Sequence, residues 1–419
     1  MLNMVCEAGF IKIVLLFLYS NTKIVKMVYQ RNIFFSLREH LGNRQVTVLT
    51  GMRRTGKTTL VKQLIAASDI RQKLYFDLER LDNRALFAEE NYETIVFALK
   101  QRGIDFTERV LLAIDEIQLT PNLPSVIKYL YDTYDIKFLL TGSSSYYLKN
   151  RFNESLAGRK KIFEVYPLTF NEFLVFREVP FVSSGHFTST PFIASEYERL
   201  KPLYEEYINY GGFPEVVLTS SVRDKKDMIL DIVSSYVNLD VASVSDFRTS
   251  AEIYKLIKLL AVRIGTKLDI SKLSSATAIS RVTVENYLEL LEQSYLIRTI
   301  PVTANSPDRE IVKARKIYFL DNGIASVSAE LSSGSKFENA VFNQLLHFGD
   351  VSYYQLKTGR EIDFILDKKA AFEVKETGAE SDLKNVRHLA KNLSIDSCYV
   401  IGRHPNQRFE GFIWGGFIQ

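Results

Sequence analysis

The chain has 419 residues, of which 46% are apolar and 24% are charged. These proportions are typical of soluble globular proteins, and the length leaves room for about three domains with sizeable cores. The net charge of +4 is too small to indicate nucleic-acid binding by itself. The two cysteines lie near opposite ends of the chain and the five histidines are scattered. Composition therefore excludes a disulfide framework and offers no metal-ligand spacing.

An apolar run at residues 10–19 (FIKIVLLFLY) lies near the start of the chain and is too short to span a bilayer. Glu7 sits where a secretory signal carries positive charge. We expect residues 1–26 to be an extension upstream of a natural start near Met27. The alternatives are a signal or anchor and an extra packed strand or helix. With the cysteine content, this predicts a cytoplasmic protein that does not bind membranes.

A short amphipathic helix is predicted at residues 31–41, and it leads into a glycine-bearing segment at residues 46–64 (VTVLTGMRRTGKTTLVKQL). This segment fits the phosphate-binding pattern G-x-x-x-x-G-K-[ST] at every position, with a β-rich run before the loop and a helical pattern after it. Gly51 and Gly56 permit the positive φ angles and close backbone approach that phosphate oxygens require. The residues expected to bind ATP are Gly51, Met52, Arg53, Arg54, Thr55, Gly56, Lys57, Thr58 and Thr59.

Two side chains of this loop have predicted chemical roles. Lys57 would place its ammonium on the outer phosphates, and Thr58 would give its hydroxyl to Mg²⁺. The helix that begins there would point its positive end at the nucleotide. A glycine-bearing turn that binds nothing is the alternative, and the strand-loop-helix context disfavours it.

A strand at residues 74–77 and a helix at residues 92–100 precede a second motif, RVLLAIDEIQ at residues 109–118. Its apolar run predicts a buried strand that ends at Asp115 and Glu116, which is a Walker B pattern. Asp115 would hold Mg²⁺ through water, and Glu116 would orient and deprotonate the attacking water. The carboxylate pair favours hydrolysis over phosphoryl transfer to a metabolite. The alternation of strands and helices implies a parallel sheet covered on both faces.

The next predicted strand, at residues 137–141 (KFLLT), is followed by a run of serines. Ser143 is the candidate γ-phosphate sensor, and the alternative is that these serines cap the next helix. Arg159 follows a glycine before another strand and is a candidate arginine finger or sensor arginine. An ordinary solvated arginine is the alternative. A finger that acts on a neighbouring chain would require a homo-oligomer.

The motifs GMRRTGKTT, LLAIDEIQ, LLTGSSS, AGRKKIFEVYPLTFNEFL and YGGFPEVV cover most of residues 46–217. Together they make the chain similar to the prokaryotic AAA-type ATPases of the archaeal-type ATPase superfamily, which carry an uncharacterised C-terminal domain. The resemblance implies ATP binding and hydrolysis by a P-loop core, with ATP and Mg²⁺ as cofactors. It also implies a helical lid at residues 180–248.

Residues 251–302 read as three helices and a strand, which resembles a winged helix-turn-helix. Ser271 and Ser280 are the expected caps of the second and third helices. The residues expected to face DNA from the third helix are Arg281, Thr283 and Asn286. Acidic residues on the same helix would repel phosphate, namely Glu285, Glu289 and Glu292. DNA contact and a protein-protein or lid role therefore both remain open.

The C-terminal region carries a second constellation of charged residues. Glu338 lies on an amphipathic helix at residues 337–346, and two predicted strands follow at residues 361–366 and 370–375. Because side chains alternate along a strand, Glu373 and Lys375 share one face, and Asp363 could join them. The spacing D-x₉-E-x-K is similar to that of the PD-(D/E)XK nuclease core. Carboxylates could hold Mg²⁺ to cut phosphodiesters, or the fold could persist as a binding surface.

The predicted fold class is α/β: a P-loop NTPase parallel sheet sandwiched by helices, a helical lid and winged helix, and a C-terminal restriction-endonuclease-like domain. The expected domains are residues 1–26, 27–179, 180–248, 249–304 and 305–419, with open boundaries near residues 180–195 and 305–308. The predicted function is ATP hydrolysis coupled to action on DNA. An ATP-controlled interaction switch that binds a partner without cleavage is the alternative, and a P-loop phosphotransferase is the weakest reading.

Overall fold

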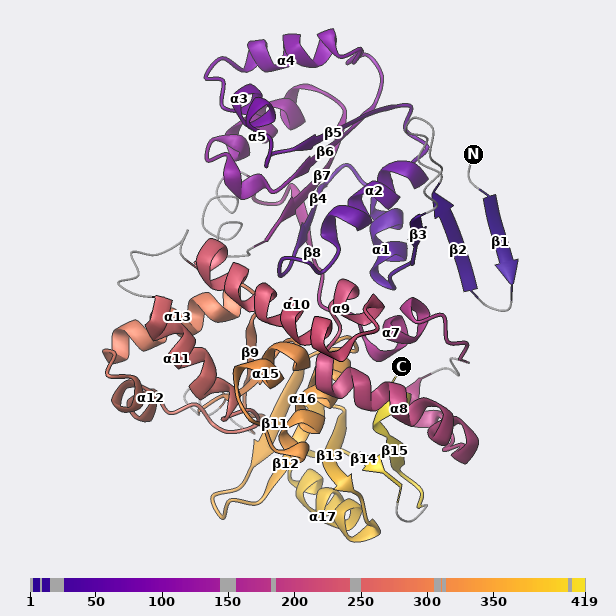
Figure 1. The fold of residues 1–419 in the computed structure, drawn as a ribbon, viewed down its shortest axis with the longest axis vertical. Helices are drawn as coiled ribbons and strands as arrows, with labels where there is room; N and C mark the ends of the chain where they lie inside the picture. The colour runs from indigo at the N-terminus through magenta and orange to yellow at the C-terminus, as the bar shows by residue number, and fades with distance from the viewer. Residues whose placement is uncertain are drawn as a thin grey trace. The chain divides into compact units, whose positions relative to one another are not determined.

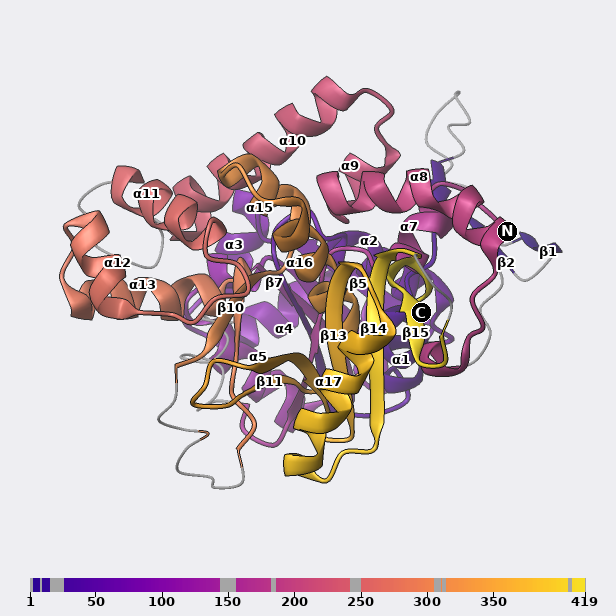
Figure 2. The same cartoon turned by 90° about the horizontal axis from the view of Figure 1, so that it is seen from below.

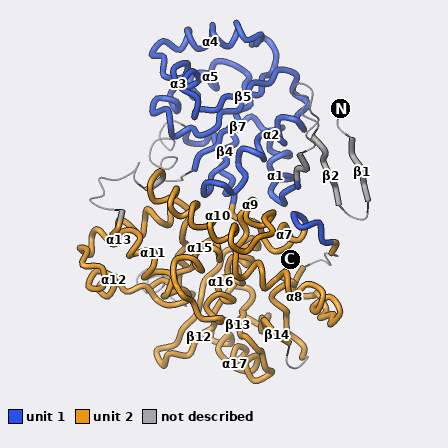
Figure 3. Tube along the Cα trace, in the orientation of Figure 1, with its two compact units in different colours: residues 1–165, 175–179 blue, residues 166–174, 180–419 orange. Residues whose placement is uncertain are grey.

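The computed structural model describes residues 3–7, 10–15, 26–143, 156–181, 186–241, 250–304, 310, 314–405 and 409–418. The chain divides into two compact units (Figure 3). Unit 1 comprises residues 1–165 and 175–179, and unit 2 comprises residues 166–174 and 180–419. The predicted lid, winged helix and nuclease-like segments thus lie in one unit, and their finer division stays a prediction. The expected boundary at residues 305–308 falls outside the described residues. No described helix is long and apolar enough to cross a membrane.

Unit 1 is built on a sheet whose described strands run parallel in the order β5-β6-β7-β4-β8 (Figure 1). The strands are β4 (Val46–Thr50), β5 (Gln72–Asp77), β6 (Val110–Asp115), β7 (Ile136–Gly142) and β8 (Lys160–Glu164). Because β6, β7 and β4 are neighbours and run parallel, their carboxyl ends lie at the same edge of the sheet. Ligands bind at this edge in open α/β sheets.

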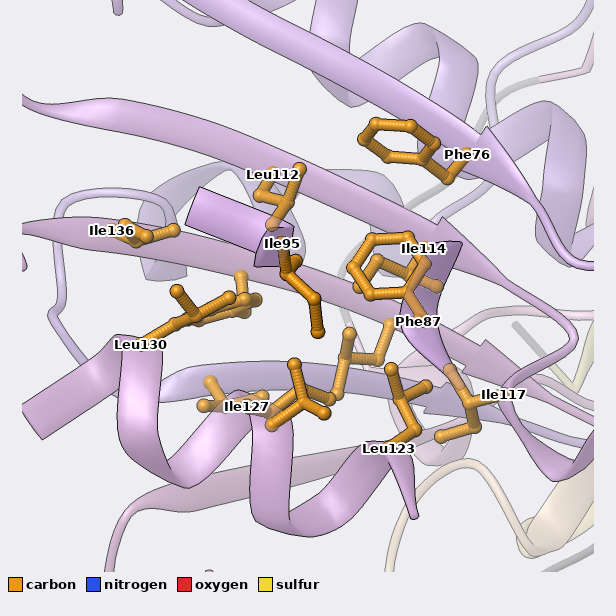
Figure 4. Close-up of a cluster of buried hydrophobic side chains, with 14 of the residues drawn as sticks. Phe76, Phe87, Ile95, Leu112, Ile114, Ile117, Leu123, Ile127, Leu130 and Ile136 are labelled. Carbon is orange, nitrogen blue, oxygen red and sulfur yellow. The ribbon is translucent and has the colours of Figure 1, made fainter. Parts of the chain in front are cut away.

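Helices cover both faces of this sheet, as the alternation of strands and helices predicted. They are α1 (Ile33–His40), α2 (Lys57–Ala67), α3 (Leu81–Phe87), α4 (Tyr92–Gln101) and α5 (Leu123–Thr133). Alternate strand residues face opposite layers, so Leu112 packs with α3, α4 and α5, whereas Leu111 packs with α1 and α2. Figure 4 shows the first of these layers, in which Ile95, Ile127 and Leu130 are fully buried.

Helices α3 and α5 of unit 1 were not predicted, and a strand within residues 1–26 was expected only as an alternative. Helix α3 was missed because its sequence, LDNRALF, is short and polar and buries only Phe87. The described part of the apolar run at residues 10–19 forms strand β2 (Phe10–Leu15), which pairs antiparallel with β1 (Asn3–Glu7) and β3 (Lys26–Val28). Whether residues 1–26 are an extension stays a prediction.

Unit 2 combines helices with two sheets. Its helices are α8 (Ala194–Tyr210), α9 (Pro214–Leu218), α10 (Val222–Ser235), α11 (Ser250–Ala261), α12 (Ile270–Thr277), α13 (Arg281–Gln293), α15 (Asn322–Ser328), α16 (Ser333–Leu345) and α17 (Glu380–Ala390). Helix α7 (Phe170–Phe176) contributes residues to both units. The strands are β9 (Ile297–Ile300), β10 (Lys316–Phe319), β11 (Val351–Gln355), β12 (Glu361–Leu366), β13 (Ala370–Thr377), β14 (Ser397–His404) and β15 (Phe412–Trp414).

The larger sheet of unit 2 has the order β11-β12-β13-β14-β15, antiparallel from β11 to β13 and parallel from β13 to β15. Helix α17 packs beside β13 and β14, which lie next to one another in Figure 2. Its apolar side chains join Ile365 and Ala371, whereas Phe364 stacks on Phe342 of α16. Helices α16 and α17 therefore cover opposite faces of the sheet.

The predicted caps of the helix-turn-helix segment were half right. Ser280 caps α13, because its Oγ accepts the Thr283 backbone N–H at 3.1 Å. The expected cap at Ser271 is wrong: Asp269 caps α12 by accepting the Lys272 N–H at 3.0 Å. Both residue types suit this position, and the helix cap lies two residues earlier than the serine suggested.

Asp321 joins two segments that are far apart in the sequence of unit 2. Its carboxylate accepts the backbone N–H of Gly212 at 2.8 Å and that of Ile324 at 3.0 Å. Gly211 has a φ of +74°, and a Cβ added there would lie 2.2 Å from Asp321 Oδ2, so only glycine fits. Asp321 is almost fully buried, and this burial raises its pKa to about 6.

The raised pKa predicts a pH-dependent stability of unit 2. Between pH 4 and 6 the folded state binds more protons at Asp321 than the unfolded state does, so the free energy of unfolding should fall as the pH rises. The expected contribution of this one group is on the order of 2–3 kcal/mol. Urea unfolding followed by the fluorescence of Trp414, the only tryptophan in the chain and buried in unit 2, measures it.

Asp321→Asn is the matched variant, because it keeps an acceptor at the helix cap and removes the titration. Its unfolding free energy should depend less on pH than that of the parent between pH 4 and 6. Equal slopes for the two proteins would show that Asp321 ionises normally in the folded state.

Candidate functional site

The phosphate loop begins at the end of β4 and ends at the first residue of α2. Gly51 and Gly56 have φ angles of +150° and +93°, as the motif predicted, and Arg54 is also left-handed at +63°. A Cβ at Gly51 would lie 2.2 Å from the carbonyl oxygen of Val165, so glycine is required there by packing as well. Positive φ angles at these positions are those of a loop that winds tightly around an anion.

Two cationic side chains donate hydrogen bonds to backbone carbonyls of the loop. Lys57 is buried, and its Nζ donates to the carbonyl oxygens of Gly51 and Met52, both at 2.8 Å. Arg31, which was not predicted, donates from Nη1 to the carbonyl oxygen of Thr55 at 3.0 Å. Nothing in the motif pointed to Arg31, because it lies before α1 and reaches the loop only through the fold.

The predicted magnesium ligands, Thr58 and Asp115, are brought together. Thr58 Oγ1 donates to Asp115 Oδ2 at 2.7 Å, although 57 positions separate them. Two further residues that were not predicted also donate to this carboxylate: Tyr75 at 2.8 Å from β5, and Thr141 from β7. Burial and the Asp115 charge raise the pKa of Tyr75 far above its usual range, so its hydroxyl stays a donor. A hydroxyl and a carboxylate are hard oxygen donors, which fit Mg²⁺.

Glu116 and Ser143 are joined by a residue that was not predicted, Gln118. The Gln118 Nε2 donates to Glu116 Oε2, and the same nitrogen is 3.0 Å from Ser143 Oγ. Glu116 has a left-handed backbone, with φ 58° and ψ 49°, and its N–H donates to Thr141 Oγ1 at 3.1 Å. Such a conformation is costly for a residue with a Cβ and is concentrated at functional sites. The alternative role of Ser143 as a cap concerns a segment outside the described residues.

Arg159 is not part of this site in its own chain. Its carbonyl oxygen accepts the N–H of Val46 at 2.8 Å, so it lies at the beginning of β4, about 16 Å along the strand from the loop. Its guanidinium pairs with Asp132, with Nε 3.1 Å from Oδ1. Because Arg159 directly precedes β8, which runs parallel to β4, it lies at the edge of the sheet opposite the loop, and this disfavours a sensor role for the nucleotide of the same chain.

The predicted acidic constellation of unit 2 gathers on α16, β12 and β13. Lys375 Nζ lies 2.7 Å from Glu373 Oε1, which agrees with the expected common face. Burial, followed by the charge of Asp363, raises the pKa of both Glu338 and Glu373 to about 7. Burial also raises the pKa of Asp363. The Asp363 carboxyl group therefore lies close enough to both Glu338 and Glu373 to influence their pKa.

Each of these acids already has a protein partner. Tyr318 donates to Glu338 Oε1 at 2.7 Å, and the Val374 N–H donates to Asp363 Oδ2 at 2.9 Å. Lys316, buried in β10, pairs with Glu361 at 2.9 Å and lowers the pKa of Glu338 by its charge. Tyr318 and Lys316 were not predicted, because β10 is outside the sheet that carries the motif. Among the residues described, no group of three or more His, Cys, Asp or Glu side chains is placed to hold a metal ion.

The third helix of the predicted winged helix, α13, presents only part of the expected surface. Arg281 and Asn286 are exposed. Thr283 Oγ1 is 2.7 Å from Ser280 Oγ and belongs to the helix cap. Glu292, expected to repel phosphate, instead accepts the Thr299 N–H at 2.9 Å and is turned toward β9. DNA contact through α13 remains a prediction.

Comparison with known proteins finds three segments that match family models. Residues 43–174 match the family described as an AAA domain, residues 201–335 match the domain of unknown function DUF8612, and residues 333–413 match the domain of unknown function DUF4143. The Walker-type ATPase PABY2304 of Pyrococcus abyssi is similar in structure, with 18% identity and a TM-score of 0.43, over 72% of this chain and 96% of that one. The AAA match supports ATP binding and hydrolysis.

Two relatives match nearly the whole chain. An uncharacterized protein of Haemophilus influenzae is 26% identical over 393 residues, which cover 87% of this chain and 92% of the relative. The uncharacterized protein MJ1544 of Methanocaldococcus jannaschii is 30% identical over 371 residues, which cover 84% of this chain and 80% of MJ1544. The chain therefore belongs to the same family as MJ1544 and carries an AAA domain at residues 43–174.

Proposed function

We propose that unit 1 binds ATP together with Mg²⁺ between the phosphate loop and Asp115, and hydrolyses it. The observation that carries this proposal is the 2.7 Å contact between Thr58 Oγ1 and Asp115 Oδ2. Mg²⁺ is held in P-loop proteins by such a hydroxyl and carboxylate while it keeps several waters. When bound, the ion would neutralise charge on the β- and γ-phosphates.

Several side chains would have separate roles in the proposed hydrolysis. Lys57 would exchange the carbonyls of Gly51 and Met52 for oxygens of the outer phosphates. Glu116 would take a proton from a water molecule as the water oxygen forms a bond to the γ-phosphorus. The bond from that phosphorus to the β–γ bridging oxygen then breaks, and ADP leaves. Ser143 would donate to a γ-phosphate oxygen. Arg159 remains a candidate finger only in a homo-oligomer, where it would act on the ATP of a neighbouring chain.

Thr58→Val tests the proposed metal site, because valine keeps the branched shape and loses the hydroxyl. We expect the Mg²⁺ concentration for half-maximal ATP hydrolysis to rise roughly 10–100-fold, which is the usual effect of removing a group that holds a metal or its ligand. Phosphate release measured against Mg²⁺ at fixed ATP gives this value. Thr58→Ser keeps the hydroxyl and should behave like the parent. Superimposable Mg²⁺ curves for Thr58→Val and the parent would contradict the assignment.

A second candidate function, action on DNA, is supported by unit 2. Its support is the 2.7 Å pair of Glu373 with Lys375, and the influence of the Asp363 charge on the pKa of both Glu338 and Glu373. The exposed Arg281 and Asn286 on α13 suit contacts to phosphate and base edges. In this function, nucleotide state would control Mg²⁺-dependent cleavage of phosphodiesters by unit 2.

The alternative is an ATP-controlled interaction switch, in which unit 2 binds a partner and cuts nothing. It is favoured by the protein partners of Glu338 and Asp363, which leave no ready group of three acids for a metal among the described residues. Replacing Asp363 separates the two functions, because cleavage requires its carboxylate and a binding surface does not.

A further inference from the structure

Gln118 occupies a position between the two groups that the proposed hydrolysis uses. It lies in a short helical turn (Ile117–Leu119) that directly follows the acid pair. Its Nε2 donates to the carboxylate of Glu116 and to Ser143 Oγ at 3.0 Å. Glu116 follows β6 and Ser143 follows β7, and these strands are neighbours in the sheet. One amide group therefore spans the ends of two adjacent strands.

The direction of these hydrogen bonds follows from the charge of Glu116. A carboxylate only accepts, so the amide nitrogen of Gln118 must face it and the amide oxygen must point elsewhere. Ser143 Oγ accepts from the same nitrogen, so one NH₂ group bonds to both side chains.

The amide oxygen of Gln118 lowers the stability of the folded state. This oxygen is buried and has no hydrogen-bond partner among the described residues. Leaving a buried acceptor unsatisfied costs about 1–3 kcal/mol, and a native structure has few such groups. A leucine would fill the same space without this penalty. Stability alone therefore does not account for a glutamine at this position.

We propose that Gln118 is a positioning residue for ATP hydrolysis. Its NH₂ group ties the Glu116 carboxylate to the Ser143 hydroxyl, so that the base for the attacking water and the sensor of the γ-phosphate keep a constant separation. This inference rests on the proposed ATPase function and adds a residue to it.

Gln118→Leu is the informative variant, because the two explanations of Gln118 predict opposite effects on stability. If Gln118 positions Glu116, kcat should fall roughly 10–100-fold, which is the cost of displacing a catalytic group by about 1 Å, and KM for ATP should stay within about twofold. The urea midpoint should be unchanged or higher.

Two further variants, Gln118→Glu and Gln72→Leu, are compared with Gln118→Leu. The first replaces the NH₂ donor by a carboxylate of the same length, which only accepts, so kcat should fall at least as far as in Gln118→Leu. The second removes a glutamine amide of β5 that bonds to Asp105 at the far end of the sheet, and its kcat should match the parent. Full kcat in Gln118→Leu, with an active parent, would overturn the inference alone. A parent that hydrolyses no ATP would overturn the proposed function instead.

Discussion

Glu116→Gln is expected to reduce ATP turnover by roughly 10²–10⁴-fold while ATP still binds, because the loss of a general base costs about that much. Glutamine has the same shape as glutamate and can still accept the Gln118 hydrogen bond through its amide oxygen, so the site should keep its geometry. It cannot take a proton from water. Steady-state phosphate release measures the turnover, and calorimetry with ATP and Mg²⁺ measures the binding.

The control for this experiment is Glu108→Gln. Glu108 is exposed and precedes β6 at the end opposite Glu116, so its replacement should leave both turnover and binding unchanged. Turnover retained in Glu116→Gln would mean that another group activates the water. Loss of ATP binding in this variant would mean that Glu116 is part of the binding surface, which the contact between Thr58 and Asp115 does not require.

The second large effect is expected for Asp363→Asn. If unit 2 cuts DNA, nicking of supercoiled plasmid in the presence of ATP and Mg²⁺ should fall to background, at least about 100-fold, because a metal ligand loses its charge. ATP hydrolysis by unit 1 should be unchanged. Asparagine can still accept the Val374 N–H through its amide oxygen, so the strand contact is preserved. Both strand breaks and released phosphate are scored in one assay.

Asp367→Asn is the matched control, since Asp367 is exposed in the turn between β12 and β13. Its φ of +49° is a conformation that asparagine adopts readily. Trp414 fluorescence checks that unit 2 of each variant is folded. If the parent retains DNA, or another partner, in an ATP-dependent manner and neither it nor Asp363→Asn nicks plasmid, the interaction switch is correct and cleavage is not.

The conformation of the phosphate loop could be predicted from the local sequence pattern. Its glycines, lysine and threonine lie within one short segment, and their backbone requirements are local, so the motif alone predicted the conformations of Gly51 and Gly56. The strands at residues 74–77, 110–115 and 137–141 were also expected, because continuous apolar runs are typical of buried parallel strands. Each was found within one or two residues of its predicted bounds.

The hydrogen-bond partners of these motif residues could be identified only from the tertiary structure. Tyr75 and Thr141 bond to Asp115 because β5 and β7 flank β6, an order that no single segment encodes. The same order separates Arg159 from the loop, since it precedes a strand whose far end lies near the nucleotide. The sequence distance between a residue and the motif does not show whether the residue lies at the beginning or at the end of a parallel strand.

In unit 2 the alternation along β13 placed Glu373 and Lys375 on one face, and the 2.7 Å ion pair agrees with it. That pattern could not reveal that Tyr318 and Lys316 of a separate strand would contact or surround these acids. The raised pKa values of Glu338 and Glu373 likewise come from burial, which depends on every element packed around them.

Short-range patterns were thus sufficient for the phosphate loop, the acid pair and the strands that carry them, because glycine conformation and the period of apolar residues act over a few neighbouring positions. Strand order, the partners of each carboxylate and the division into two units arose from packing between distant segments. The chemistry of this protein depends on both, since the motif provides the groups that meet the nucleotide and the sheet order sets what holds them in place.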